Sequence, residues 1–244
     1  MNYAIILAGG KGVRFQGDIP KQFVELTNCP MLVYSMRTAQ VNKHVDAICV
    51  VAPESYHVRI RKWAKEYGIT KLSICAESGR ERYQSVYQGL MALPAKPRDT
   101  VIIMTAVCPF VSQLTMDKLY AAMEKWEACI TVIKATDAIT FSNDGKNVNR
   151  TLQKKKLFVQ QGPQIFRYGI LRQAHRAYLE DEDRIEVNED SELVLNIGVE
   201  CGMVLGDRYC IKVTYPEDLA MAQALYPLFV KQEQGIKNVR SKGV

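Results

Sequence analysis

Short apolar runs separated by helical segments are the feature that most constrains the fold of this chain. The runs at residues 3–7 and 45–51 are apolar at nearly every position, which is typical of strands buried on both faces. Strands are expected at residues 3–7, 45–51, 71–75, 100–104, 129–133, 157–161 and 200–205, and helices at 30–41, 55–67, 83–93, 114–126, 167–179, 192–197 and from 216 onward. This alternation predicts an α/β fold in which helices cover both faces of a mostly parallel sheet.

The first expected strand leads directly into a glycine-rich segment with two cations close by. Residues 8–14 read Ala-Gly-Gly-Lys-Gly-Val-Arg, and Pro-Lys-Gln-Phe follows at 20–23. Glycine has no Cβ, so a loop of this composition lets backbone N–H groups approach an anion closely. Arg14 and Lys21 would add fixed positive charge. The segment therefore predicts a phosphate-binding loop, with an ordinary turn between a strand and a helix as the alternative.

Two common glycine motifs are incomplete in this loop. The dinucleotide-binding pattern G-x-G-x-x-G would need a glycine where Phe15 stands. The phosphate-binding loop of nucleotide hydrolases would need a lysine where Asp18 stands. The sequence therefore supports neither a Rossmann dehydrogenase nor a P-loop hydrolase.

The composition fits a single domain that handles a small anionic substrate. The chain has 244 residues, 48% of them hydrophobic, which is enough for one large core. Its net charge of +6 suits a substrate such as a nucleotide. No basic cluster is interleaved with aromatic residues, so no nucleic-acid partner is expected. The densest basic run, residues 154–156, reads as a solvated turn or arm.

The cysteines point to a reducing compartment. There are seven, none in a C-x-x-C pair, and several lie inside apolar runs. This usage predicts free thiols that serve as small hydrophobic side chains, and a cytoplasmic location. The first strand is expected from residue 3, and no apolar run reaches the length of a membrane span, so neither a signal peptide nor a membrane partner is expected.

The alternation of strands and helices breaks between residues 134 and 156. Two strand-like pieces flank an Asp-Gly at 144–145, which is a hairpin signal. We therefore expect an arm, at about residues 138–156, that protrudes from the sheet. One domain is expected over residues 1–232, with a turn at 162–166 and a flexible basic tail at 233–244.

Five segments of the chain, in the right order, resemble one enzyme family. They are residues 7–14, 20–23, 78–86, 162–166 and 211–219. They are similar to the cytidylyltransferases of the 2-C-methyl-D-erythritol 4-phosphate and ribitol 5-phosphate type, which transfer CMP from CTP to a polyol phosphate. The resemblance spans nearly the whole chain. It implies a Rossmann-like domain that forms a homodimer, uses Mg²⁺, and reaches into its partner's active site with the arm.

The resemblance also implies roles for the residues at matching positions. The cations around the triphosphate would be Arg14, Lys21 and Lys212. The nucleotide would be held by Ala8, Gly9, Gly10, Gly12, Gly79, Arg82, Ser85 and Thr105, and the acceptor by Lys154, Asn188 and Glu189. A substrate phosphate is already ionised at neutral pH and can attack the α-phosphorus of CTP without a protein base. Catalysis by positioning and cations therefore fits these residue types.

The chain departs from the family pattern on the metal and acceptor side. The family's Mg²⁺-binding aspartate and a nearby arginine are replaced by Thr105 and Cys108, and an asparagine by Cys210. The arm's arginine falls on Lys154, and the Thr-Asp pair of the substrate site on residues 188–189. Mg²⁺ often takes most of its ligands from phosphates and water, so the loss of one carboxylate need not abolish binding, and the protein ligands are left unassigned.

Two interpretations of these departures stay open. The first is an active cytidylyltransferase with a changed acceptor, for which a ribitol 5-phosphate-like acceptor is favoured over a methylerythritol one. The second is a degenerate paralogue that binds nucleotide without catalysis and has a structural or regulatory role.

Overall fold

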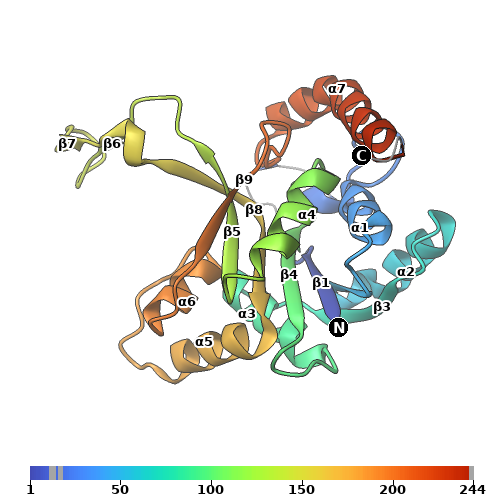
Figure 1. Ribbon diagram of the computed structural model, residues 1–244, viewed down its shortest axis with the longest axis horizontal. Helices are drawn as coiled ribbons and strands as arrows, with labels where there is room; N and C mark the ends of the chain where they lie inside the picture. Colours follow the sequence, from blue (N-terminus) through green and yellow to red (C-terminus); the bar gives the residue numbers. More distant parts are fainter. Residues whose placement is uncertain (11–14, 16–18, 242–244) are drawn as a thin grey trace.

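A seven-stranded mixed sheet forms the centre of the molecule (Figure 1). The computed structural model of the protein describes residues 1–10, 15 and 19–241, with side chains through residue 235. The strands lie in the order β3-β2-β1-β4-β8-β5-β9. They are β1 (Asn2–Leu7), β2 (Ala47–Ala52), β3 (Leu72–Glu77), β4 (Thr100–Thr105), β5 (Ala128–Lys134), β8 (Phe158–Arg167) and β9 (Gly202–Leu205). The neighbours β3, β2, β1 and β4 run parallel, as do β5 and β9, which confirms the mostly parallel sheet.

Strand β8 is the exception, because it runs antiparallel to both β4 and β5. The prediction of a strand at residues 157–161 followed by a turn at 162–166 is wrong, since one strand covers both segments. Gly162 and Pro163 form an irregularity inside the strand, because the pairing with β5 shifts register between Ile130 and Thr131. Beyond it, Ile165 and Phe166 are fully buried, which keeps the chain in the sheet.

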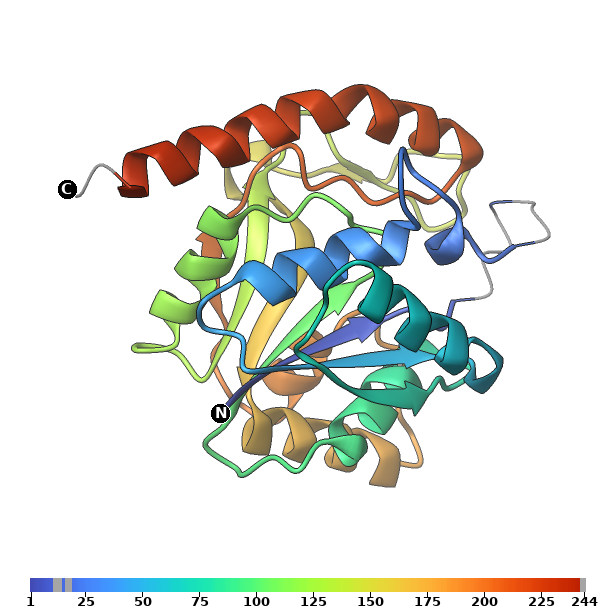
Figure 2. The same ribbon diagram turned by 90° about the vertical axis from the view of Figure 1, so that its right-hand side faces the viewer.

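Seven α-helices flank the sheet in the part of the chain that the structure describes. They are α1 (Met31–Val41), α2 (His57–Glu66), α3 (Arg82–Ala92), α4 (Gln113–Ala122), α5 (Tyr168–Glu180), α6 (Asp190–Asn196) and α7 (Pro216–Ser241), with short 3-10 turns η2 (Lys21–Phe23), η3 (Glu54–Tyr56) and η4 (Lys154–Lys156). Helices α1, α2, α4 and α7 pack in one apolar cluster, and α3, α5 and α6 in the other. Figures 1 and 2 show the two helical layers on opposite faces of the sheet, as expected from the sequence.

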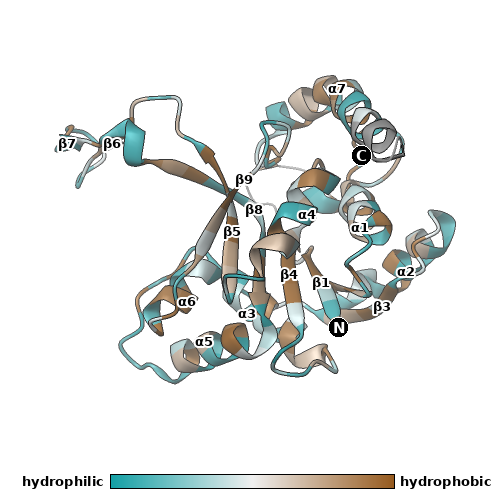
Figure 3. Cartoon of the chain, in the orientation of Figure 1, coloured by the Kyte–Doolittle hydropathy of each residue, from teal (hydrophilic) through white to brown (hydrophobic). Residues whose placement is uncertain are grey.

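Strand β1 connects the two apolar clusters. Ala4 and Ile6 belong to the cluster under α1 and α2, whereas Tyr3 and Ile5 belong to the cluster under α3. Successive side chains of a strand point to opposite faces, so a strand covered on both sides must be apolar throughout. Figure 3 shows the resulting hydrophobic colour along the central strands, with mixed colouring on the helices.

The predicted arm is a two-stranded hairpin between β5 and β8. Its strands are β6 (Thr140–Phe141) and β7 (Arg150–Thr151), and it stands away from the sheet in Figure 1. Gly145 has φ of 68°, which fits the expected Asp-Gly turn. The carboxylate of Asp144 accepts hydrogen bonds from the backbone N–H groups of Asn147 and Lys146, and these bonds lower its pKa.

Helix α7 is longer than the sequence predicts. It runs to Ser241, whereas the last helix was expected to end near residue 232. Its aromatic residues explain its attachment to the body, because the buried ring of Phe110 stacks on Tyr226 and Phe229, with centroids 6.0 and 5.1 Å apart. None of the helices in the described ranges is long and apolar enough to cross a membrane.

Candidate active site

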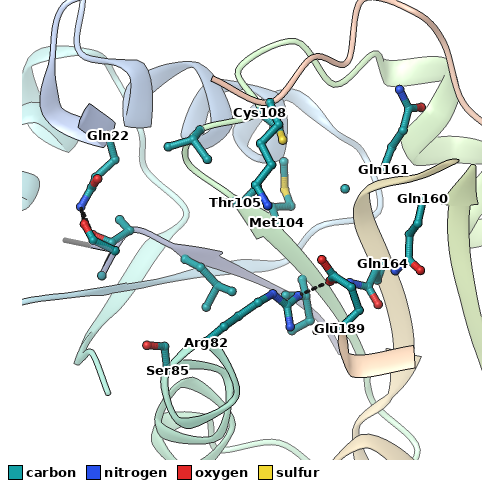
Figure 4. Close-up of a pocket in the computed structure, with 18 of the residues that line it drawn as sticks. Gln22, Arg82, Ser85, Met104, Thr105, Cys108, Gln160, Gln161, Gln164 and Glu189 are labelled. Carbon is teal, nitrogen blue, oxygen red and sulfur yellow. Dashed lines mark hydrogen bonds and ion pairs between the residues drawn. The ribbon is translucent and has the colours of Figure 1, made fainter. Parts of the chain in front are cut away.

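A cavity of about 530 Å³ opens at the carboxyl ends of β1 and β4 (Figure 4). The chain leaves β1 toward β2 and β3, then returns to place β4 on the other side of β1. In open α/β sheets, ligands bind at such a reversal of strand order. The cavity is lined from four directions: the loop after β1, the start of α3, the loop after β4, and strand β8 with the segment that precedes α7.

The cavity brings together ten of the fourteen site residues predicted from the sequence. These are Ala8, Gly9, Gly10, Lys21, Gly79, Arg82, Ser85, Thr105, Glu189 and Lys212. Gly12 and Arg14 lie outside the described residues. Asn188 and Lys154 do not line the cavity. The ten residues come from segments far apart in the sequence, so their convergence is a property of the fold.

The loop after β1 is held by the buried side chain of Gln22. Its amide nitrogen donates to the carbonyl oxygens of Ala8 and Gly10, at 2.7 and 2.9 Å. Because one side chain binds two carbonyls of the loop, the path of the backbone at the cavity edge is fixed. The sequence reasoning missed this role, although Gln22 stands inside the Pro-Lys-Gln-Phe segment that marked the site.

Two glycines allow close contacts at the edge of the cavity. A Cβ atom at Gly9 would overlap the side chain of Ser78, and one at Gly79 would overlap that of Gln84. Gly9 therefore serves the contact between the loop after β1 and the loop before α3, whereas Gly79 lets the chain pass close to the first turn of α3.

The start of α3 is capped by its own side chains. Glu81 and Gln84 form a capping box, in which the Gln84 amide oxygen accepts from the backbone N–H groups of Arg80 and Glu81 at 2.9 and 3.0 Å. The Ser85 hydroxyl accepts from the Gly79 N–H at 3.1 Å and donates to the Glu81 carbonyl at 3.2 Å. Ser85 therefore shapes the loop that faces the cavity, and a helix N-terminus at that place favours an anion.

Arg82 lies at the centre of a partly buried charge network. Its guanidinium contacts Glu189 at 2.9 Å and Asp190 at 2.7 Å, and the other carboxylate oxygen of Asp190 lies 2.9 Å from Nε2 of His175. Asp190 and His175 are fully buried. The network ties α3, α5 and α6 together beside the cavity, as Figure 4 shows for Arg82 and Glu189.

Opposing effects set the ionisation of this network. Burial disfavours the charge on Arg82, but the carboxylates of Asp190 and Glu189 outweigh it and raise its pKa. Burial likewise disfavours the charge on Asp190, but Arg82 and His175 outweigh it and lower its pKa. For Glu189, burial prevails over the attraction of Arg82, and its pKa is raised. The network therefore contains an ionised Asp190 paired with a charged Arg82.

Of the two substrate-site residues predicted at 188–189, only one lines the cavity. The Glu189 side chain lines the cavity, where it accepts a hydrogen bond of 2.5 Å from Gln164 of β8. For Asn188, the backbone N–H donates to the Glu192 carboxylate at the start of α6. Glu189 is the cap residue of α6, in a capping box with Glu192, which explains why it faces the cavity at a fixed position.

Two lysines reach the cavity from opposite loops. Lys21 lies in η2, after the loop that Gln22 holds. Lys212 lies in the segment before α7, and the Val213 N–H fixes this segment by donating to the Val107 carbonyl at 2.9 Å. The two ammonium groups provide positive charge on two sides of one cavity.

The loop after β4 supplies little that could hold a metal. Thr105 offers a single hydroxyl oxygen, and no group of three His, Cys, Asp or Glu residues in the described part of the chain is placed to bind a metal ion. Mg²⁺ prefers several oxygen ligands. The described residues therefore do not form a protein-made Mg²⁺ site.

Comparisons with known proteins agree on one family. A family model for IspD, 2-C-methyl-D-erythritol 4-phosphate cytidylyltransferase, matches residues 2–227. A protein of that name from Rubrobacter xylanophilus is 36% identical over 225 residues, which cover 91% of this chain and 93% of the relative. One from Syntrophus aciditrophicus is 32% identical over 233 residues, which cover 95% and 97%. The crystal structure of 4-diphosphocytidyl-2C-methyl-D-erythritol synthase from Anaerococcus prevotii is similar with a TM-score of 0.80 at 26% identity, covering 93% of this chain and 96% of that one.

Replacement of Asp190 tests the charge network. Asp190→Asn should lower the free energy of unfolding at pH 7 by about 1–3 kcal/mol, because it removes the fully buried carboxylate that pairs with both Arg82 and His175. Denaturation in urea measures this loss. The matched control is Asp183→Asn at an exposed position, expected to change stability by less than about 0.5 kcal/mol.

The same variant should also change how the free energy of unfolding depends on pH. The pKa of Asp190 is below its ordinary value of 3.8 in the folded protein, so its stabilising contribution is present above that value and is lost as the pH falls through the lower, folded value. The difference in stability between wild type and Asp190→Asn should shrink in that acidic window. A difference that is small at pH 7, or constant down to the acid transition, would contradict the network.

Proposed function

Since the chain belongs to the 2-C-methyl-D-erythritol 4-phosphate cytidylyltransferase family, we propose that it transfers a cytidylyl group from CTP to 2-C-methyl-D-erythritol 4-phosphate and releases pyrophosphate. The family is one of nucleotidyltransferase enzymes. The observation that carries the proposal is the convergence of Lys21, Lys212, the glycine loops and the start of α3 on one cavity. The methylerythritol acceptor takes precedence over the ribitol 5-phosphate acceptor favoured from the sequence, because the family model and the relatives quoted above carry the methylerythritol name.

The proposed reaction needs positioning and positive charge. An oxygen of the acceptor phosphate attacks the α-phosphorus of CTP, a new P–O bond forms, and the bond to the β-phosphate oxygen breaks. Negative charge builds on the pyrophosphate that leaves and on the oxygens of the α-phosphate. Cations on both sides of the cavity stabilise that charge, and no protein nucleophile is required.

We assign the nucleotide to the side of the cavity formed by the β1 loop and α3. Ala8, Gly9 and Gly10 border this side together with Gly79, and the capped start of α3 favours the anionic phosphates. Ser85 acts by fixing the loop that would meet the base and ribose. Arg82 keeps the sequence-based assignment to the nucleotide side, but its guanidinium is engaged by Glu189 and Asp190, so its main contribution is to position α3.

The acceptor would occupy the side formed by β8, Glu189 and Lys212. The Lys212 ammonium is the cation available for an acceptor phosphate in this part of the described cavity, and Glu189 and Gln164 can bind hydroxyl groups. Thr105 and Cys108 stand where the family pattern has charged residues, so electrostatic stabilisation rests on fewer cations here than that pattern provides.

Mg²⁺ is proposed as a component of the substrate rather than as a resident ion. The described residues do not form a metal site of their own, and a nucleotide can bring Mg²⁺ bound to its phosphates and to water. In this form the ion would neutralise phosphate charge, while Thr105 could contribute at most its hydroxyl oxygen.

A homodimer is proposed from the shape of the arm. The hairpin stands away from the body and carries exposed apolar side chains, Phe141 at 42% and Val148 at 68%. Lys154 follows it, and its ammonium donates to the Thr136 carbonyl at the base of the arm at 3.1 Å. A second copy that covers these side chains would bring Lys154 toward its acceptor site. A cytoplasmic location is proposed as well, supported by seven free cysteines.

An assay of pyrophosphate release tests the function. The protein is incubated with CTP and Mg²⁺ together with 2-C-methyl-D-erythritol 4-phosphate, ribitol 5-phosphate or no acceptor. We expect release with the methylerythritol acceptor and little with the others. Release only with ribitol 5-phosphate would reassign the acceptor. Measurable CTP binding by calorimetry with no release from either acceptor would replace the proposal by a non-catalytic, nucleotide-binding role.

Lys212 is expected to matter for the chemical step. Lys212→Met keeps the side-chain length but removes the charge, and it should lower kcat/KM by at least about 100-fold, the effect typical of losing one donor to the transition state. Lys43→Met removes a charge from an exposed turn after α1 and serves as the control, with kcat/KM expected to be unchanged. Equal activity of the two variants would remove Lys212 from the active site.

The arm can be tested through the oligomeric state. Light scattering should give the mass of two chains for the wild type. Val148→Asp should shift the equilibrium toward one chain, because it places a charge in the apolar contact, whereas Val58→Asp at another exposed apolar position should not. A wild-type monomer would refute the proposed dimer and the role of Lys154 in a partner's site.

A further inference from the structure

A second cavity, of about 990 Å³, lies at the end of β4 opposite the active site. It is bordered by the turn before β4, the end of β8 and the first half of α5, and it shares no lining residue with the active-site cavity. Thr100 begins β4 on this side and Thr105 ends it at the active site, about 16 Å away at 3.3 Å per residue. Figure 1 shows α5 and the turn before β4 at the end of the sheet opposite the arm. The two cavities are therefore separate places on the molecule.

Four arginines line this second cavity, which we call the arginine groove. They come from three segments: Arg98 from the turn before β4, Arg167 from the end of β8, and Arg172 and Arg176 from α5. Among the described residues, Glu127 is the one acidic side chain in the lining. The lining thus has an excess of three positive charges, equal to half of the net charge of +6 of the whole chain.

Arg167 provides a guanidinium that is already held in place. It donates to the Thr100 hydroxyl at 3.1 Å and to the Met123 carbonyl at 3.0 Å, and both of these acceptors are uncharged. Its ion pair with Glu127 is long, at 3.9 Å, and the glutamate side chain is more than half exposed. The hydrogen bonds fix the position of Arg167 in the wall, while most of its charge remains available to a ligand.

The other three arginines are exposed and weakly neutralised. Arg176 pairs with Glu180 at 2.7 Å, but both side chains face solvent, which screens the pair. Arg98 and Arg172 make no ion pair with the residues that the structure describes, and Asp99 is paired with the N-terminal ammonium at 2.7 Å. Arg172 and Arg176 are four positions apart on α5, where like charges repel. An anion in the groove would replace this repulsion by attraction.

The backbone that carries these arginines is held by hydrogen bonds. The Tyr168 N–H donates to the Asp99 carbonyl at 2.8 Å, and the Gly169 N–H to the Pro97 carbonyl at 2.9 Å. A Cβ atom at Gly169 would lie only 3.0 Å from Pro97, so glycine allows α5 to approach the turn this closely. Because these carbonyls occupy the first two N–H groups of α5, the positive charge of the groove comes from the guanidinium groups rather than from the end of the helix.

We propose that the arginine groove binds a small oligophosphate, an anion with two or more linked phosphate groups. Guanidinium groups bind phosphate oxygens through paired hydrogen bonds, and several phosphates are needed to contact arginines on three segments. A volume of about 990 Å³ accommodates a molecule of nucleotide size. A nucleic-acid strand fits less well, because Tyr168, the aromatic residue of the lining, is 3% exposed and offers no face for a base to stack on.

Calorimetric titration with sodium tripolyphosphate tests the role of the arginines. Arg98→Gln combined with Arg172→Gln should weaken binding at the groove at least about tenfold, since it removes two charge-assisted contacts. Lys62→Gln combined with Lys65→Gln is the matched control, because it removes the same charge from the exposed face of α2 and should change the affinity less than about twofold. An equal loss in both double variants would reduce the effect to the overall charge and overturn the site.

Hydrogen exchange measured by mass spectrometry tests the location. Saturating tripolyphosphate should slow exchange in peptides that cover residues 95–99 and 168–176, both in the wild type and in Lys212→Met, whose change lies in the other cavity. Unchanged exchange in these peptides would overturn the proposal. Because neither measurement needs turnover, the result is independent of whether the protein releases pyrophosphate from CTP.

A comparison of ligands tests the chemical class. Binding of ADP and pyrophosphate with equal affinity would assign recognition to the phosphates alone, whereas tighter binding of ADP would assign a nucleoside oligophosphate, and both results support the proposal. AMP, which has one phosphate, should bind at least about tenfold more weakly than ADP. Equal affinity for AMP and ADP, or tighter binding of a 20-nucleotide RNA than of tripolyphosphate with protection of the same peptides, would overturn it.

Discussion

The register of β1 between β2 and β4 is the constraint on which the cavity depends. Leu7 pairs with Val51 on one side and Thr105 on the other, and the ladder continues past the strand end. The Ala8 N–H donates to the Val51 carbonyl at 2.7 Å, and the Ala106 N–H to the Leu7 carbonyl at 3.0 Å. These bonds place the start of the glycine loop beside the loop after β4. A slip by one residue would turn every side chain of β1 to the other face and would also separate the two loops.

The buried carboxylate of Asp190 is the second feature that shapes the cavity. Asp190 is fully buried, and such a carboxylate is tolerated only when cations and hydrogen bonds compensate its lost hydration. Arg82 and His175 supply that compensation from α3 and α5, so the start of α6 can lie against the start of α3. The same contacts orient Glu189 toward the cavity. The ion pairs that compensate the desolvation of Asp190 thus fix the positions of three helices beside the cavity.

The sequence was most informative where one local segment determines the outcome. The apolar run at residues 3–7 predicted β1, and the Asp-Gly pair predicted the hairpin, because strand burial and turn geometry are local properties. The prediction was wrong for β8, since Gly162 and Pro163 normally mark a turn and the pairing with β4 that overrides them comes from residues about sixty positions away. Gln22, His175 and Asp190 were missed for a similar reason. Each acts through side-chain bonds to partners twelve or more positions away, which the local pattern does not reveal.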